Sequence, residues 1–233
     1  MIWIICTVIT ILLLVDRTIH VSSRKPLSPK PSTFAKRLCK VHQARMTMNY
    51  RFSADKKYFL KYAYLYVYVR KGRRNAESDC NILIRQVIWD FKDGVYDSEV
   101  LYRTAHLLET LFIGKSLNEY TLVCIPASSA YKHEKRFKSF CAELCNLTGL
   151  KNGFNRIEIR GERLQIHSSS DRNTPDWENC LWTNGHLWHG SKIILLDDVL
   201  TTGKTFGSFK AYLEGRGATV VCGVFLATVP END

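Results

Sequence analysis

The pattern of hydrophobic and polar residues alternates between strand-like and helix-like segments from residue 120 onwards. Thr121–Ile125 and Ile193–Leu196 are apolar runs of strand length, and Thr219–Val229 is a longer one. Ala130–Thr148 and Lys204–Arg216 carry apolar residues at three- and four-residue spacings, and a glycine follows each, which is typical of amphipathic helices. Strands that alternate with helices favour a mostly parallel sheet covered on both faces. We therefore expect an α/β fold for this half of the chain.

The part before residue 120 predicts one strand and two helices. Lys61–Arg70 alternates, with four tyrosines on one face and aliphatic residues on the other, which is typical of a half-buried strand. A row of tyrosines beside basic residues can also stack on nucleic-acid bases, and that alternative stays open. Cys80–Asp93 and Asp97–Gly114 have the apolar spacing of amphipathic helices.

Charge sets the N-terminal third apart from the rest. The 233-residue chain has a formal net charge of +11, and residues 1–75 hold 16 Lys and Arg against two Asp, a net of +14. A basic segment can bind nucleic acid or an anionic membrane surface, and a solvated leader is the alternative. We expect residues 1–48 to be a leader outside the folded domain. We expect 49–118 to form a strand and helices that can act as a hood, and 119–233 to form the core.

The first residues and the cysteines bear on localisation. Ile2–Val15 is an uncharged apolar run, shorter than the roughly 20 residues of a spanning helix, and no positive side chain precedes it as in a signal peptide. It is a short anchor, an atypical signal, or a leader that the working protein lacks. The eight cysteines include no Cys-x-x-Cys pair, so we expect no zinc site and reduced thiols. We therefore expect a cytoplasmic protein, with membrane association as the alternative.

The strand Ile193–Leu196 leads into the segment that carries chemistry. Asp197 and Asp198 follow it, and then a turn rich in hydroxyl groups opens the helix at Lys204. In open α/β sheets, ligands bind at the carboxyl ends of the strands. Backbone N–H groups at a helix N-terminus bind phosphate, and Gly203 allows close approach of the backbone. Carboxylates beside a phosphate cradle suit sugar hydroxyls, or a Mg²⁺ shell bound through water. The pattern predicts a sugar-phosphate site.

This segment resembles the 5-phosphoribosyl-1-pyrophosphate (PRPP) signature of type I phosphoribosyltransferases: four aliphatic residues, an acidic pair, two aliphatic residues, then small or hydroxyl residues around a glycine. The resemblance implies the fold of that superfamily. It implies that the acidic pair binds the ribose hydroxyls, with Mg²⁺ nearby, and that the turn holds the 5′-phosphate. The PRPP-binding residues so implied are Asp197, Asp198, Val199, Leu200, Thr201, Thr202, Gly203, Lys204 and Thr205.

A second segment resembles the pyrophosphate loop of the ComF-like (competence-protein-related) branch of that superfamily. After Pro126 comes a basic run in which Glu134 and Phe137 match the Glu-Arg-Gly-Phe-Asn-Gln pattern of this branch, although Arg136 stands at its glycine. Val87–Gly94 resembles the Lys-Tyr-Gly element that precedes its core. The four-cysteine zinc ribbon of the branch is absent. The pyrophosphate-binding residues that this resemblance implies are Ala127, Ser128, Ser129, Lys132, Lys135 and Arg136.

Two further parts of the site are expected from the superfamily. Arg160–Asn173 has the place of the loop that closes over PRPP, and Arg163 in it can cover developing charge. The candidate catalytic residues are Asp197, Asp198 and Arg163. The acceptor base is chosen by the hood, for which residues 50–118 and 176–190 are candidates. Within the latter, Trp182 or Trp188 can stack on a base.

These features favour an enzyme that uses Mg²⁺ and PRPP, transfers the phosphoribosyl group to a nucleobase-like nitrogen and releases pyrophosphate. The alternative is a non-catalytic ComF-like protein that binds PRPP or nucleotides and acts in DNA uptake or regulation, which the basic N-terminal third favours. The third hypothesis is that the N-terminus docks the domain on a membrane. We count PRPP, an acceptor base, a second copy of the chain as a homodimer, and nucleic acid at the N-terminal third among the candidate partners.

Overall fold

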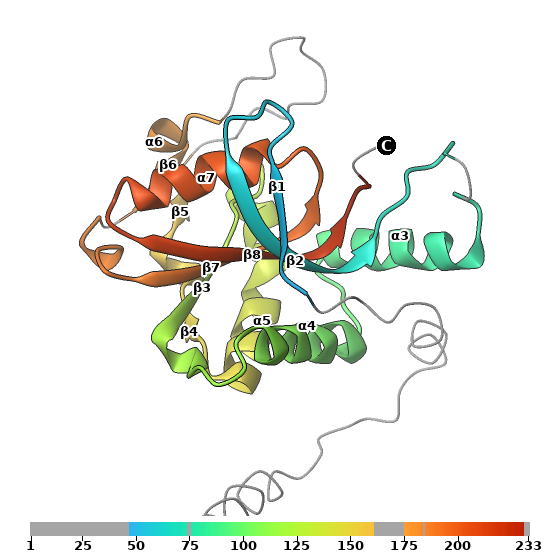
Figure 1. Ribbon diagram of the computed structural model, residues 1–233, viewed down its shortest axis with the longest axis horizontal. Helices are drawn as coiled ribbons and strands as arrows, with labels where there is room; N and C mark the ends of the chain where they lie inside the picture. The colour runs from blue at the N-terminus through green and yellow to red at the C-terminus, as the bar shows by residue number, and fades with distance from the viewer. Residues whose placement is uncertain (1–46, 74–75, 161–174, 184, 231–233) are drawn as a thin grey trace, which may run out of the picture. The chain divides into compact units, whose positions relative to one another are not determined.

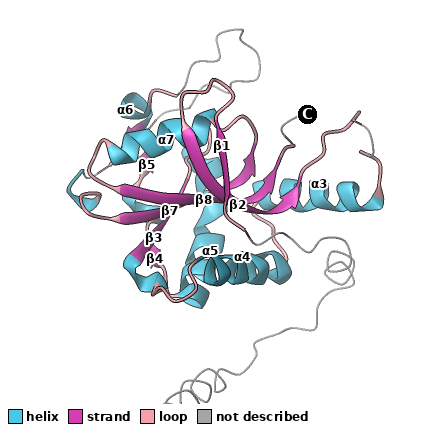
Figure 2. Cartoon of the chain, in the orientation of Figure 1, coloured by secondary structure: helices cyan, strands magenta, loops and turns pink. Residues whose placement is uncertain are grey.

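A six-stranded, mostly parallel sheet lies at the centre of the described chain (Figures 1 and 2). The structure, a computed structural model, describes residues 47–73, 76–160, 175–183 and 185–230, all of which belong to the unit Arg37–Asp233. The strand order is β1-β2-β8-β7-β3-β4, and only the β1–β2 pair is antiparallel. The strands are β1 (Asn49–Phe52), β2 (Phe59–Val67), β3 (Tyr120–Cys124), β4 (Lys151–Asn152), β7 (Lys192–Leu200) and β8 (Thr219–Thr228).

Helices cover both faces of the sheet, as Figure 1 shows with α7 above it and α4 and α5 below it. The long helices are α3 (Asp79–Lys92), α4 (Ser98–Leu111), α5 (Ala130–Thr148) and α7 (Lys204–Glu214). A short helix α6 (Trp177–Cys180) and a small sheet of β5 (Glu158–Ile159) and β6 (Leu181–Trp182) lie between β4 and β7 in the chain. Single 3₁₀ turns occupy Leu117–Glu119, Phe154–Arg156 and Gly185–Leu187. The expected α/β class, with a mostly parallel sheet between helices, is confirmed.

The hydrophobic core explains why β7 and β8 lack polar alternation. Residues 193–196 of β7 and 224–227 of β8 are buried, as expected for parallel strands that are covered on both faces. Side chains of alternate residues point to opposite faces, and Ile193 and Leu195 pack with Phe206 and Phe209 of α7. The opposite face of β7 therefore points toward α3 and α5.

The helices lie where the apolar spacing predicted them. The bounds of α5 are the expected ones, and Gly149 ends it in the left-handed conformation (φ 76°). The side chains of Ser78, Asp97 and Ser129 cap α3, α4 and α5 by accepting hydrogen bonds from backbone N–H groups of the first turn. Short polar residues before each apolar pattern thus fix where the helices begin.

The N-terminal strands belong to the central sheet. β2 pairs in parallel with β8, so residues on both sides of the expected boundary at 118–119 share one sheet. Tyr62 and Tyr66 of β2 are buried, which places these two rings in the core and excludes them as a surface for stacking bases. Within the described residues, no helix is both long enough and apolar enough to cross a membrane.

Strand β7 is longer than the sequence predicted. It does not end at Leu196 but continues to Leu200, because β8 continues to pair with it: Asp197 lies opposite Phe225, and Leu200 lies opposite Thr228. On its other side, β3 ends where Cys124 faces Leu196. On the side of β8, the acidic pair therefore lies within the paired part of β7. On the side of β3, it lies beyond the last paired residue.

Candidate functional site

The acidic pair lies at a step in the sheet, where β7 extends past the end of β3. The last contact between the two strands is a hydrogen bond of 2.8 Å from Ile125 N–H to the Leu196 carbonyl. The loop after β3 leaves the sheet at this step, beside Asp197 and Asp198. Because parallel strands share one carboxyl edge, the expected acidic pair and the expected pyrophosphate loop meet there. Figure 1 shows β3 and β7 side by side.

Asp198 is buried, with 4% of its surface exposed, and faces α3 and α5. Lys92 Nζ and Arg136 Nη1 each lie 2.8 Å from Asp198 Oδ2, and Val199 N–H donates to Asp198 Oδ1 at 2.6 Å. A buried carboxylate is stable only when it is paired and hydrogen-bonded, and both conditions hold here. Asp198 is therefore held by groups of the protein itself.

Asp197 has a different environment from its neighbour. Its side chain points to the other face of β7 and is only partly buried, and its Oδ1 accepts a hydrogen bond of 2.8 Å from Asp198 N–H. Desolvation raises the pKa of Asp197 well above its usual range, and repulsion by the Asp198 carboxylate adds to the rise. Arg136 and Lys92 oppose the shift. Asp197 is the member of the pair whose carboxylate lacks a cation at ion-pair distance among the described residues.

The two cations on Asp198 converge because the end of α3 packs tightly against the start of α5. Gly94 follows α3 with φ 77°, and a Cβ atom there would lie 2.3 Å from the Lys135 carbonyl oxygen. Lys135 Nζ also pairs with Asp93 at 3.2 Å. Glycine at position 94 thus permits the close approach that brings Lys92 and Arg136 to one carboxylate. In the sequence, Val87–Gly94 resembles an element that precedes the ComF-like core, but Lys92 was not predicted to be a site residue.

The turn after β7, where the sequence predicts an anion cradle, leads into the start of α7. Thr201 and Thr202 are exposed, and Gly203 (φ 77°) precedes α7 without any side-chain cap. The N–H groups of a helix's first turn have no partner inside the helix, and the helix dipole makes that end positive. A start without a side-chain cap, next to two threonine hydroxyls, is suited to a phosphate group.

The hairpin turn between β1 and β2 braces this cradle. Ala54 N–H donates to the Thr202 carbonyl at 2.8 Å, and the Arg51 guanidinium donates to the Thr201 carbonyl. A Cβ atom on Gly203 would lie 2.2 Å from Leu60 Cδ1, so β2 fits closely against the turn. The N-terminal strands therefore position the cradle, a role that the sequence did not predict.

A buried histidine, His133, accepts a hydrogen bond from the loop after β3. Ala127 N–H donates to His133 Nδ1 at 3.4 Å, a long hydrogen bond, and the buried His133 ring stacks on Phe154 with centroids 5.0 Å apart. Burial lowers the pKa of His133 to about 4, and the Arg136 charge adds to the shift, so the imidazole is neutral near pH 7. The Ala127 amide is thus occupied, whereas the partly exposed Ser128 and Ser129 remain at the surface of the loop.

The remaining candidate residues are dispersed. Lys132 and Lys135 are exposed on α5, and Lys135 is engaged by Asp93. Trp188 is fully buried, so it packs in the core and cannot stack on a base as the sequence suggested. The side chain of Trp182, and Arg163 with the expected lid, lie outside the described residues. Among the described residues, no cluster of three His, Cys, Asp or Glu side chains has the arrangement of a metal site.

Comparison with solved structures finds phosphoribosyltransferases. An adenine phosphoribosyltransferase is 12% identical and covers 84% of this chain and 89% of its own, with a TM-score of 0.42. The adenine phosphoribosyltransferase from Thermoanaerobacter pseudethanolicus is 15% identical, with coverages of 82% and 87% and a TM-score of 0.40. The orotate phosphoribosyltransferase from Aeropyrum pernix is 15% identical, with coverages of 84% and 93% and a TM-score of 0.37. No protein-family model and no curated protein matches the sequence.

Proposed function

We propose that this protein is a type I phosphoribosyltransferase that binds PRPP and transfers its phosphoribosyl group to a nucleobase-like nitrogen acceptor. The observation that carries the proposal is the geometry at the carboxyl edge of the sheet. There the partly exposed Asp197 precedes a helix N-terminus without a side-chain cap and lies beside the loop that follows β3. A carboxylate for hydroxyl groups and a cradle for phosphate thus occur together in one short segment.

Different groups of the site bind the phosphate and the ribose of PRPP. The 5′-phosphate accepts hydrogen bonds from N–H groups at the start of α7, and the ribose hydroxyls donate to Asp197. In the reaction, the acceptor nitrogen forms a bond to C1 of the ribose while the bond from C1 to the pyrophosphate oxygen breaks. Pyrophosphate leaves with the electron pair, and the proton of the acceptor N–H passes to water. Arg136 and Lys92 are the cations at hand for that leaving charge, because both reach the step in the sheet.

The donor set fits Mg²⁺ only in part. Mg²⁺ in proteins is bound through one or two carboxylates together with substrate phosphates and water. Asp197 suits this role, directly or through water, whereas Oδ2 of Asp198 already lies next to two cations. Bound Mg²⁺ would neutralise the charge that develops on pyrophosphate. The residues that would hold it are Asp197 and, through oxygen atoms of the ligand, the cradle.

An exposed tryptophan on α3 is a better candidate for contact with the acceptor base than Trp188. Trp89 is 41% exposed and lies one helical turn before Lys92, and Lys71 Nζ lies 5.3 Å from the centre of its ring. An exposed indole one turn from a residue of the site offers a flat surface to a heterocyclic base. We include Trp89 in the proposed acceptor side of the site.

Within the superfamily we propose the ComF-like branch, on the matches at Glu134 and Phe137 and in the segment Val87–Gly94. A second function, PRPP binding without transfer, is favoured by one observation. The Ala127 amide is bound to His133, and Arg136 is bound to Asp198, so two groups expected to hold pyrophosphate already have partners in the protein.

One experiment tests the proposal and separates the two functions. The full chain with Mg²⁺ and PRPP is assayed for pyrophosphate release with a panel of adenine, guanine, hypoxanthine, uracil and orotate, and PRPP binding is measured by calorimetry. The matched variants are Asp197→Asn and, as a control on α4, the exposed Glu109→Gln. The enzyme function is supported if the unaltered chain releases pyrophosphate, Asp197→Asn abolishes this release and Glu109→Gln leaves it unchanged. Binding without release supports the non-catalytic function, and absence of PRPP binding contradicts both.

A further inference from the structure

Three large aromatic side chains lie exposed together on the hairpin of β1 and β2. Tyr50, Phe52 and Phe59 are 57%, 59% and 54% exposed. Phe59 stacks on Tyr50 with ring centroids 6.0 Å apart and meets Phe52 edge-on at 5.4 Å. We call these three residues the aromatic face. Contiguous exposed aromatic residues on a soluble domain mark a site of interaction.

The register of the hairpin explains why these rings share one face. Phe52 lies opposite Phe59, and Tyr50 lies opposite Lys61, so the four side chains project from the same side of the two strands. Leu60 and Tyr62, which alternate with them on β2, point inward and are buried with α7. The aromatic face is therefore the outer side of a hairpin whose inner side belongs to the core.

The charges around the aromatic face are positive. Lys61 is on the face itself, and Lys57 is on the turn before β2; neither forms an ion pair within the described part of the chain. Asp55 is the only acidic residue in 47–67, and it is engaged by the Ser53 hydroxyl and by Lys204. Residues 1–46, which precede β1 in the sequence, hold eight Lys and Arg against one Asp. An anionic partner is favoured over a cationic or neutral one.

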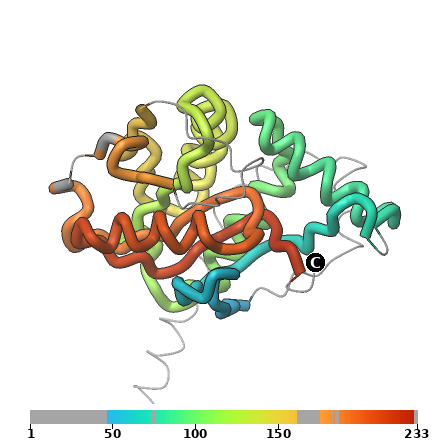
Figure 3. Tube along the Cα trace, turned by 90° about the horizontal axis from the view of Figure 1, so that it is seen from above, coloured from blue at the N-terminus to red at the C-terminus, as the bar shows by residue number. Residues whose placement is uncertain are grey.

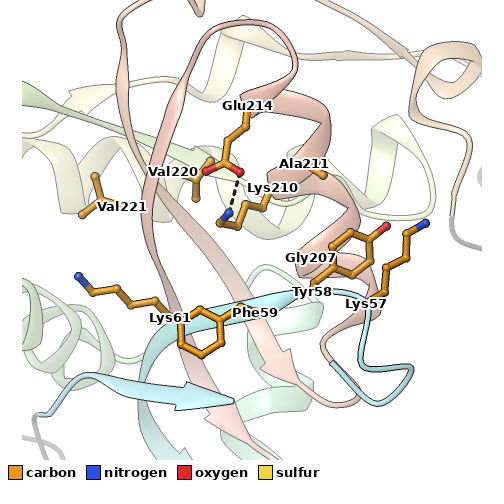
Figure 4. Close-up of a pocket in the computed structure, with 10 residues that line it drawn as sticks. All are labelled: Lys57, Tyr58, Phe59, Lys61, Gly207, Lys210, Ala211, Glu214, Val220 and Val221. Carbon is orange, nitrogen blue, oxygen red and sulfur yellow. Dashed lines mark hydrogen bonds and ion pairs between the residues drawn. The ribbon is translucent and has the colours of Figure 1, made fainter. Parts of the chain in front are cut away.

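A groove of about 430 Å³ adjoins the aromatic face. Phe59 and Lys61 contribute to its lining from β2, and Gly207, Lys210 and Glu214 contribute from α7 (Figure 4). The acid in it, Glu214, is paired with Lys210 at 2.6 Å, as the dashed line in Figure 4 shows. The groove thus extends the surface toward α7 without adding an unpaired carboxylate.

We propose that the aromatic face, with Lys57 and Lys61, binds single-stranded nucleic acid. Unpaired bases stack on the exposed rings, and the phosphates lie against the lysines. A duplex would not fit, because its bases are already stacked and their faces are closed. A second copy of the chain is disfavoured as the occupant, since a two-fold contact at this face brings Lys57 and Lys61 against their own counterparts. Because the surface contacts only the faces of the bases and the phosphates, we expect DNA and RNA strands of the same sequence to bind with similar affinity.

The test is fluorescence anisotropy of the full chain with a labelled oligothymidylate of about 15 nucleotides, a length that matches typical single-strand sites. Replacing Phe52 and Phe59 by Ser removes the stacking surface, and we expect the affinity to fall by about 10-fold or more. Replacing Lys57 and Lys61 by Gln removes phosphate contacts. We therefore expect the magnitude of the slope of log affinity against log salt concentration to decrease by about 1 to 2. Ile113→Ser, at an exposed apolar residue after α4, is the matched control and leaves both quantities unchanged.

Other outcomes overturn the proposal. If the Phe52→Ser, Phe59→Ser variant binds the oligonucleotide as the unaltered chain does, the binding arises elsewhere and the aromatic face is not the site. If sedimentation shows a dimer that this variant dissociates, the face joins two copies of the chain instead. Tyr50→Ser replaces the double variant if the latter fails to unfold cooperatively in urea. If a uridine oligonucleotide binds with an affinity within a few-fold of that of its thymidine counterpart, contact through base faces and phosphates is supported. A strict preference for RNA or for DNA contradicts this mode of binding.

Discussion

Lys92 Nζ lies 2.8 Å from Asp198 Oδ2, and through this contact the end of α3 reaches the carboxyl edge of the sheet. Arg136 approaches the same oxygen at the same distance from the opposite helix, but its side chain is much less exposed than that of Lys92. One buried carboxylate is therefore held by an inner and an outer cation. The two cations should contribute unequally to stability.

Removing the inner cation should destabilise the fold more than removing the outer one. Arg136→Met leaves a buried carboxylate without its less exposed cation, and we expect the free energy of unfolding to fall by about 3 kcal/mol. Lys92→Met should lower it by about 1 kcal/mol, because that side chain is substantially exposed and water can replace it. Urea unfolding of both variants measures the difference. Equal losses would show that the two contacts with Asp198 are equivalent.

The acidic pair should separate into a ligand-binding and a structural member. Asp197→Asn should weaken ribose 5-phosphate binding by at least about 10-fold, since a charged hydrogen-bond acceptor is lost. It should not lower stability, and at pH 8 it should raise it, because the folded state holds the Asp197 proton above its usual pKa and ionisation disfavours folding as pH rises. Asp198→Asn should instead lower the free energy of unfolding by about 3 kcal/mol. Calorimetry and urea unfolding at pH 8 measure these effects, and identical behaviour of the two variants would refute the division.

The junction of α3 and α5 can be tested with two glycines that have the same φ angle. Gly94 and Gly114 both have φ 77°, but an added Cβ atom meets the Lys135 carbonyl oxygen at position 94 and nothing within 4 Å at position 114. Gly114→Ala should therefore show the cost of the left-handed conformation alone, about 1 kcal/mol. Gly94→Ala should cost about 2 kcal/mol more, as overpacking typically does. If thermal or urea unfolding shows equal losses, the close approach of the two helices is not needed for the fold.

Acidification should destabilise the protein through His133. Its pKa is lowered to about 4 in the folded protein, whereas in the unfolded chain it keeps its usual value near 6.5. Between these values the unfolded state binds more protons, so the stabilising contribution is complete above pH 6.5 and is lost as pH falls toward 4, by at most about 3 kcal/mol. His133→Asn keeps an acceptor for Ala127 N–H and should flatten this dependence in urea titrations. His106→Asn, on the exposed side of α4, is the control and should not.

The acceptor side of the site can be tested through Trp89. AMP, GMP, UMP and orotidine monophosphate carry the sugar phosphate with a base, and ribose 5-phosphate carries it without one. We expect at least one nucleotide to bind more tightly than ribose 5-phosphate, and Trp89→Leu to remove about 5- to 10-fold of that gain, as expected for a lost aromatic pair. The affinity for ribose 5-phosphate should not change. Tyr102→Leu on α4 is the control, and an unchanged gain in Trp89→Leu would place the base elsewhere.

The sequence predicted the elements whose signals are local. Apolar spacing gave α3, α4 and α5 to within two or three residues at each end, because capping residues and glycines mark helix ends directly. It placed the end of β7 too early, since the aspartates there read as the end of an apolar run. What keeps them in the strand is pairing with β8, which is a tertiary contact.

For the candidate site, the sequence shows the residues that are adjacent in the chain but not the contacts between distant segments. The acidic pair and the cradle occupy adjacent positions, so their types and order were readable from Asp197 to Thr205. The separation of Asp197 from Asp198 depends on which face of β7 each one takes and on two helices that converge there. Lys92 and the bracing turn at Ala54 come from distant parts of the chain, and composition says nothing about such contacts.

The pairing of β2 with β8 has a consequence for the order in which the molecule is made. The tube in Figure 3 shows the early blue strands beside the late red ones. A ribosome must therefore deliver the last strand before the first two can join the sheet, and until then the hairpin has no neighbour on its inner edge. The cradle that this hairpin braces is completed only after β8 has been made, so shortening the chain before Thr228 should leave newly made protein dependent on chaperones.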